Sequence, residues 1–474
     1  MKKIIYLFIL ISFASCQKWL DVKPEDKFIE EDAFSSPEGF ATALNGIYLK
    51  LAASNMYGGE LTMNGVDLLA QYYYVPEGHP AAMRGWVAYH YEEEEAKVRI
   101  DNIWKNQYSN ITNINKFISN IETWNSVLDP ISRDIYKGEA LALRAYLYFD
   151  LLRLFAPSYT ENPLAARIPY YDEAGYVIAP FSTSESVVAH ILEDLRQAEE
   201  LLKKDPVLQL ETVDIPRGII GESNWKTRNN RLNFYAVKGL QARVNLYIGN
   251  NEDALAAAKR VIQDQSKFPW INADQVNNEN LPNRIFSTEI LFQFENPKLY
   301  EYYNANFGSS VTNQTILSSG PDNSFLRLVY ENWENDFRYS PSWKIEGGKT
   351  FPLFIKYKDV TSKDNVNFRF KVPGIRLSEM FLIAAETESN PNEALSYLNE
   401  LRIHRNCIPL TSTNLLMNAI QSEYAKEFYG EGQMWFFYKR KSAPAILSAS
   451  TLNMEPINID DYTLPIPLSE TENR

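Results

Sequence analysis

Two segments that lie far apart in the chain share one helix-start pattern. In each segment an asparagine, Asn250 or Asn390, precedes an acidic residue three positions later, Asp253 or Glu393. An asparagine side chain caps free N–H groups at a helix start, and the helix dipole stabilises an acidic residue in the first turn. The apolar residues that follow recur in one register: Ala254, Leu255, Ala258 and Val261 in the first segment, and Ala394, Leu395, Leu398 and Leu401 in the second.

The helices that precede these two segments also match each other, with Val237, Leu240 and Val244 corresponding to Leu377, Met380 and Ala384. Each unit is therefore predicted to be helix, tight turn and helix, spanning roughly 30 to 34 residues, the size of a tetratricopeptide hairpin. One such hairpin cannot bury its apolar face alone, so several must stack. The predicted fold is mainly α, with tetratricopeptide-like hairpins in a curved scaffold, long irregular loop inserts and minor β structure.

Further helices fit the same architecture and bring the number of hairpins to about four. One is predicted to begin near Ser35, because a hydroxyl cap is followed there by an early proline and a glutamate. Others are predicted over residues 100–123, around the segment 141–148, and over 184–202, where Ser182 and Glu185 would form a capping box.

The first residues indicate export and lipid anchoring. Lys2 and Lys3 precede an apolar run that is too short to cross a bilayer, which takes about 20 residues, but has the length of a signal-peptide core. The run ends in the lipobox-like sequence FASC, so Cys16 is the predicted lipid attachment site. The alternative is an ordinary signal peptide with an incidental cysteine. The predicted division is a signal peptide over 1–15, a lipid-anchored tether over 16–34 and one helical-repeat domain over 35–474.

Cysteine content and charge restrict the remaining possibilities. The chain has 2 cysteines, and lipid attachment at Cys16 leaves Cys407 without an intramolecular partner. Stability must then come from a core, which the 45% hydrophobic composition supplies. The formal charge of −13 argues against nucleic acid as a partner, because lysine and arginine carry phosphate binding.

Four long inserts, over 56–91, 156–181, 205–231 and 268–372, separate the hairpins and hold many of the aromatic residues. A sugar ring binds a flat aromatic surface through its C–H face, while amide or charged groups hydrogen-bond its hydroxyls. The alternative is that these rings fill the core beneath the loops. The candidate ligand-binding residues are Tyr72, Tyr74, Arg84, Trp86, Tyr300, Tyr302, Tyr303, Asn304 and Trp343.

Patterns for catalysis and cofactors are not found in the sequence. The chain has 4 histidines, none in a His-Glu-x-x-His motif, and it has neither a nucleophile elbow nor a phosphate loop. A pair of glycosidase carboxylates has no local spacing signature, so a glycosidase stays an alternative. No cofactor is predicted; loop carboxylates leave a structural calcium possible, but no 12-residue calcium loop indicates one.

Several blocks of the sequence resemble the SusD/RagB family of outer-membrane lipoproteins of the Bacteroidota. The blocks occur in the family's order and are CQKWLDVKP at 16–24, GEALALRAYLYFDLLR at 138–153, IRLSEMFLIAAE at 375–386, EYAKEFYGEG at 423–432 and LPIPLSE at 464–470. Arg144, Glu379 and Glu386 match family motifs within helices, where we expect them to be partnered structural charges.

The resemblance implies a binding protein at the cell surface, anchored in the outer membrane by lipid, and not an enzyme. Such proteins capture a nutrient, most often an oligosaccharide, and deliver it to a SusC-like TonB-dependent transporter. Peptide binding by the same architecture is the first alternative, and a surface glycosidase is the second.

Overall fold

The computed structural model describes residues 33–472 except 176, 214–226 and 365. The predicted signal peptide, Cys16 and nearly all of the tether lie outside the described residues. No helix in the described part of the chain is both long enough and apolar enough to cross a membrane.

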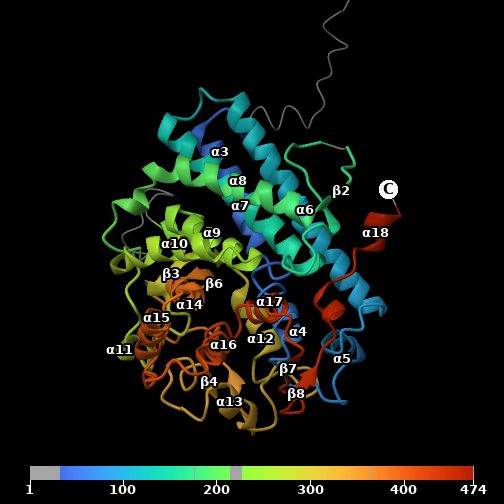
Figure 1. The fold of residues 1–474 in the computed structure, drawn as a ribbon, viewed down its shortest axis with the longest axis vertical. Helices are drawn as coiled ribbons and strands as arrows, with labels where there is room; N and C mark the ends of the chain where they lie inside the picture. The colour runs from blue at the N-terminus through green and yellow to red at the C-terminus, as the bar shows by residue number, and fades with distance from the viewer. Residues whose placement is uncertain (1–32, 176, 214–226, 365, 473–474) are drawn as a thin grey trace, which may run out of the picture.

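A row of packed helices occupies the upper and left part of the molecule in Figure 1. Consecutive members of the row pack against each other in the order α6, α7, α8, α9, α10, α14 and α15. Their bounds are α6 Glu94–Thr123, α7 Pro130–Phe155, α8 Ser184–Leu201, α9 Phe234–Ile248, α10 Asn251–Ile262, α14 Leu377–Thr387 and α15 Pro391–His404. We call this row the hairpin stack. It confirms the predicted helical fold class.

Both halves of the predicted repeat form the expected hairpins, α9–α10 and α14–α15. Asn250 accepts a hydrogen bond from the Asp253 N–H, and Asn390 accepts one from the Asn392 N–H at 3.0 Å. Within the first hairpin, a Cβ added at Gly239 would lie 2.8 Å from the Ile375 side chain. The missing side chain therefore lets α9 approach the strand that precedes α14.

Two predicted helix starts differ from the structure. The cap of α8 is Thr183, whose hydroxyl accepts a hydrogen bond from the Ser186 N–H, so the predicted Ser182 cap is wrong by one residue. α6 begins at Glu94, before the predicted residue 100, because Glu94 and Glu95 suit the positive end of the helix dipole. The helix predicted near Ser35 is α3, Pro37–Leu51, capped by Ser36.

Most of the remaining elements are short and fill the lower part of Figure 1, whereas α3 lies near its top and the C-terminal helix at its right. The short α-helices are α4 Gly65–Leu69, α5 Ala81–Val87, α11 Ala273–Val276, α12 Leu299–Asn306, α13 Ser324–Val329, α16 Leu416–Glu427, α17 Met434–Arg440 and α18 Leu468–Thr471. The 3₁₀ turns are η1 Leu202–Lys204, η2 Pro206–Leu208, η4 Arg228–Asn230, η5 Gln265–Lys267, η6 Ser287–Glu289 and η7 Ile459–Tyr462. We call this part, with the loops that join it, the insert side.

The strands of the described residues form antiparallel pairs. β3 pairs with β6 in a register from Ile290 opposite Arg376 to Glu295 opposite Lys371, and this pairing closes the part of the longest insert that lies between the two strands. The pairs are β1 Ala166–Pro169 with β2 Phe181–Thr183, β3 Ile290–Glu295 with β6 Lys371–Arg376, β4 Trp343–Lys344 with β5 Leu353–Phe354, and β7 Ala445–Leu447 with β8 Met454–Pro456.

Paired charges join the helices of the stack. Arg144 on α7 contacts Asp194 on α8 at 2.7 Å, and Arg243 on α9 contacts Glu379 on α14 at 2.6 Å. A third pair joins the stack to the insert side: Glu386 at the end of α14 contacts Arg440 on α17 at 2.5 Å. The expectation that Arg144, Glu379 and Glu386 are partnered structural charges is confirmed.

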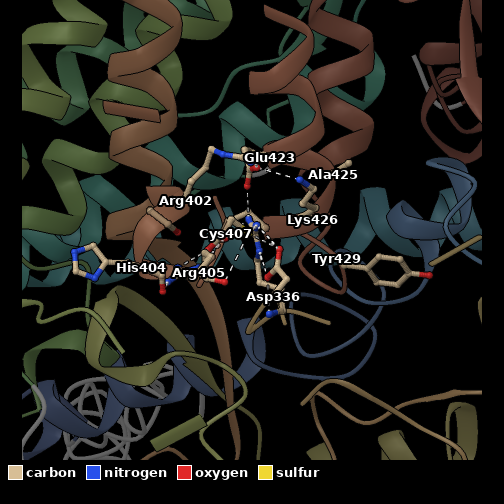
Figure 2. Close-up of polar contacts among 12 residues, drawn as sticks. Asp336, Arg402, His404, Arg405, Cys407, Glu423, Ala425, Lys426 and Tyr429 are labelled. Carbon is tan, nitrogen blue, oxygen red and sulfur yellow. Dashed lines mark hydrogen bonds and ion pairs between the residues drawn. The ribbon is translucent and has the colours of Figure 1, made fainter. Parts of the chain in front are cut away.

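A larger buried charge network joins the insert side to the ends of α14 and α15 (Figure 2). Glu427, which is buried, forms ion pairs with three arginines, Arg338, Arg376 and Arg405. Glu423, one turn earlier on α16, contacts Arg338 at 2.7 Å through one carboxylate oxygen. A second set of partners, Arg402 and Lys426, binds the other carboxylate oxygen of Glu423.

The network also determines which of its groups are charged. Burial alone raises the pKa of Glu423, but Arg338, Lys426 and Arg402 together outweigh it and bring that pKa down to about 2. Cys407 lies at the edge of the network, where its thiol donates to Asp336 at 3.1 Å. Burial raises the pKa of this thiol to about 12, so Cys407 is a protonated core residue.

A buried carboxylate connects the first insert to the C-terminal region. The two oxygens of Asp67, in α4, accept backbone N–H groups of Gly430 at 2.7 Å and Gly432 at 3.1 Å. Both glycines have positive φ, 80° and 70°. Beside them, the rings of Tyr72 and Tyr429 stack with centroids 4.3 Å apart.

Candidate functional site

Four of the predicted ligand-binding residues are part of the core in this structure. Tyr72, Trp86, Tyr303 and Trp343 are 2%, 1%, 3% and 6% exposed. Each polar ring atom of the first two has a protein partner: the Tyr72 hydroxyl donates to the Ala425 carbonyl at 2.8 Å, and the Trp86 indole N–H donates to the Gly65 carbonyl at 2.9 Å. Their rings are almost fully covered by protein, as the core-filling alternative expects, although Tyr72 also borders the groove described below.

The other five predicted residues are accessible, but they are spread over the insert side. Arg84 and Asn304 are exposed, whereas Tyr74, Tyr300 and Tyr302 are half-buried. The Tyr300 ring packs on Phe370 with centroids 4.7 Å apart, and its hydroxyl accepts the Phe370 N–H at 3.1 Å. Tyr300 therefore orders its own insert.

The two predicted aromatic clusters do meet. Asn64, just before α4, donates to the Tyr302 hydroxyl on α12 at 2.8 Å and to the Asn306 carbonyl oxygen at 3.3 Å. The guanidinium of Arg99 on α6 lies 4.6 Å from the centroid of the Trp86 ring. The two inserts that hold the predicted clusters therefore contact each other, and the polar groups at this contact bind one another.

A groove of about 320 Å³ lies on the insert side between α13, α16, α17 and the β7–β8 hairpin. This volume is at the lower end of the range for ligand pockets, about 300–1,000 Å³. We call it the insert groove. Its lining residues are Tyr72, Phe325, Leu328, Val329, Asn418, Gln421, Ser422, Ala425, Met434, Tyr438, Leu447 and Met454.

One wall of the insert groove is polar and the opposite wall is apolar. Asn418, Gln421, Ser422 and Ala425 come from α16, where their spacing of three and four residues places them on one face. Among the hydrogen bonds of the described residues, none involves the side-chain amides of Asn418 and Gln421, so both amides are available to a ligand. The facing side chains are aliphatic and aromatic.

The chemistry that the groove offers is neutral. None of the described residues that line it is charged. Burial raises the pKa of Tyr72 and also that of Tyr438, so both hydroxyls stay protonated at physiological pH. The groove supplies amide hydrogen bonds and aliphatic contact, which suit binding. Within the described residues no group of 3 or more His, Cys, Asp or Glu side chains could hold a metal ion.

Sequence reasoning missed Asn418 and Gln421, and the only local signal was the polar face of an amphipathic helix. Such a face is ordinarily solvated. The groove becomes visible only when the fold brings α16 beside α13 and the β7–β8 hairpin.

Two family models match the chain at its two ends. One, described as starch-binding and associating with the outer membrane, matches residues 18–212. The other, described as the SusD family, matches residues 292–472. The chain belongs to the SusD/RagB family.

Relatives agree with membership in the SusD/RagB family along nearly the whole chain. A SusD-like protein of Formosa agariphila is 23% identical over 91% of this chain and 90% of that protein. A crystal structure of a SusD superfamily protein from Bacteroides thetaiotaomicron has a TM-score of 0.70 at 22% identity, covering 92% of this chain and 98% of that one.

Solved SusD-like structures with binding descriptions share the same fold. A SusD-like carbohydrate-binding protein from Bacteroides vulgatus has a TM-score of 0.69 at 18% identity, covering 92% of this chain and 96% of that one. Surface glycan-binding protein A from Bacteroides uniformis has a TM-score of 0.66 at 17% identity, covering 93% of this chain and 98% of that one.

Proposed function

We propose that this chain is a non-catalytic lipoprotein of the outer-membrane surface that captures a neutral nutrient glycan in the insert groove. It then delivers the glycan to a SusC-like TonB-dependent transporter. The family's description as starch-binding and associated with the outer membrane supports the location and the ligand class. The observation that carries the proposal is the groove itself, with free amides on one wall, apolar side chains on the other and no charged lining residue.

A glycan in this groove would use both walls. Hydroxyls pair well with amides, because Asn and Gln each offer a donor and an acceptor that match the donor and acceptor of a hydroxyl. The C–H faces of the sugar rings would lie against the apolar wall, where Leu328 and Met454 are the exposed side chains and the buried rings of Phe325 and Tyr438 form the floor.

A peptide is the second candidate ligand, because the apolar wall contains aliphatic side chains in addition to rings. Leu328 and Met454 are 49% and 55% exposed and flank the groove. These side chains suit an apolar peptide residue better than a hydroxyl-rich surface.

Two single variants distinguish these ligands. Gln421→Ala removes one hydroxyl-binding amide, and we expect it to weaken glycan binding about fivefold, the effect of losing roughly 1 kcal/mol. Leu328→Ala should weaken peptide binding more than glycan binding. Isothermal titration against a panel of neutral oligosaccharides and a tryptic peptide mixture measures both effects, with Gln197→Ala on α8 as the matched control. Glycan binding that is unchanged in Gln421→Ala would remove the groove from the proposal.

The lipid anchor is tested separately. Cys16→Ala should give a folded protein that leaves the membrane fraction, measured by fractionation of cells that lack the partner transporter. Retention of the variant in the membrane of such cells would contradict anchoring through Cys16. Incubation of the purified protein with polysaccharides, followed by an assay for new reducing ends, tests the glycosidase alternative.

A further inference from the structure

The accessible apolar side chains of the insert groove do not match a bare sugar. Leu328 on α13 and Met454 on β8 are 49% and 55% exposed, whereas the lining rings of Tyr72, Phe325 and Tyr438 are buried. A flexible aliphatic or thioether side chain has no flat face on which a sugar ring could stack. An apolar group that projects from the ligand would cover these two side chains better than the hydroxyl-rimmed face of a ring.

Hydrogen-bonding groups line the same groove. α13 packs against α16, and α16 contributes Asn418 and Gln421, which are exposed and lie one helical turn apart. Among the hydrogen bonds of the residues that the structure describes, none uses either side-chain amide. Each amide therefore offers N–H donors and a carbonyl acceptor to a ligand that also contacts Leu328 and Met454.

This combination restricts the substituent that the ligand carries. None of the described residues that line the groove is charged, so a sulfate or carboxylate would lose water without gaining a cation. A long acyl chain does not fit, because the volume of about 320 Å³ must also hold the sugar unit. An acetyl group meets both requirements, since its carbonyl oxygen accepts an amide N–H and its methyl group packs on an aliphatic side chain.

We propose that the insert groove selects glycans that carry acetyl groups. This inference rests on the proposed capture of a neutral glycan in the same groove, and it adds the substituent that the groove recognises. The acetyl carbonyl accepts from the amide of Asn418 or Gln421, and the sugar hydroxyls pair with the other amide. The acetyl methyl group lies against Leu328 and Met454. A glycan of this kind accounts for the aliphatic wall without a peptide ligand.

Ligand pairs that differ only in acetylation test the inference. Acetylated oligosaccharides from a neutral glucomannan and a neutral xylan are added to the oligosaccharide panel, each beside the same preparation after mild alkaline deacetylation. We expect the protein to bind the acetylated form of a pair about tenfold more tightly, the combined effect of one buried methyl group and one hydrogen bond. Isothermal titration measures both affinities.

Two variants test whether the aliphatic wall is the cause. Leu328→Asn and Met454→Gln replace an apolar side chain by an amide of similar size, and both positions are about half exposed, so the variants should fold, which circular dichroism checks. Each should lose about fivefold in affinity for the acetylated ligand and less than about twofold for the deacetylated one. Leu164→Asn, at an exposed leucine in the loop before β1, is the matched control.

This inference and the glycan-capture proposal fail in different ways. Equal affinity before and after deacetylation in every pair that binds, or an acetyl preference that is unchanged in both variants, would overturn the inference and leave glycan capture standing. If no member of the panel binds, glycan capture itself fails. A crystal structure of the complex should show the acetyl methyl group in contact with Leu328 and Met454, and an acetyl group that points into solvent would overturn the inference.

Discussion

The hairpin stack and the insert side both contain many buried side chains, yet different ion-pair arrangements stabilise them. In the stack, single Arg–carboxylate pairs such as Arg144–Asp194 and Arg243–Glu379 join neighbouring helices. Where the insert side meets the ends of α14 and α15, Glu427 alone binds three arginines, Arg338 from the longest insert and the cap residues Arg376 and Arg405. The difference follows from the backbone, because long helices satisfy their own hydrogen bonds and bury a continuous apolar face.

The short elements and loops of the insert side neither satisfy all of their own backbone hydrogen bonds nor bury a continuous apolar face. The insert side therefore depends on a few shared centres that fix several segments at once, and Glu427 is the clearest of these. We expect that removal of such a shared centre destabilises several segments at once. Removal of one ion pair in the stack should destabilise only the two helices that the pair joins.

The largest expected effect is that of Glu427→Gln, which leaves Arg338, Arg376 and Arg405 without their shared carboxylate. Removing one partner from a buried ion pair costs about 3–5 kcal/mol, and a shared carboxylate places this variant at the top of that range. Urea denaturation measures the loss, with the surface variant Glu193→Gln as control. A loss no greater than that of the control would refute the idea of a shared centre.

Acidification should destabilise the insert side at a higher pH than the hairpin stack. Glu423 has a folded-state pKa of about 2 against an ordinary value of 4.5. Because the unfolded chain binds the proton more readily, the stability that Glu423 contributes is complete above about pH 4.5 and falls as the pH drops toward 2. We expect near-ultraviolet circular dichroism and tryptophan fluorescence to change over this window before far-ultraviolet helicity. Simultaneous loss of all three signals would show that the regions unfold together.

Glu379→Gln should have a smaller effect than Glu427→Gln. It breaks one pair, that with Arg243, and about 3 kcal/mol is expected, at the lower end of the range for buried pairs. Hydrogen exchange should increase mainly in α9 and α14. Increased exchange across the insert side as well would show that the stack does not confine the damage.

The smallest effect is expected for Gly239→Ala. The new Cβ would lie 2.8 Å from the Ile375 side chain, and overpacking of a core contact costs about 1–3 kcal/mol. A thermal melt compared with that of Gly46→Ala, where an added Cβ meets no atom within 4 Å, isolates the packing contribution. An equal shift in both variants would mean that helix propensity, and not close packing, explains the result.

The same contrast explains what the sequence could predict. Helical spacing and caps are local, so α9, α10, α14 and α15 were predicted with their register. Local sequence does not show whether an aromatic ring is buried. Tryptophan and tyrosine are typical both of ligand-binding surfaces and of cores, so the burial of Trp86 and Tyr72 could not be predicted. The insert groove was missed because its polar wall on α16 and its apolar wall on α13 and β8 meet only in the folded chain.

The hydrogen bonds between Asp67 and the turn at Gly430 and Gly432 have a consequence for how the molecule is made. The carboxylate leaves water only when residues more than 360 positions further along the chain are in place, as the separations of 363 and 365 show. Contacts of such long range slow folding. The first insert therefore stays incomplete until almost the entire polypeptide has emerged, and a chain cut short before Gly430 would leave an unsatisfied acid among apolar side chains.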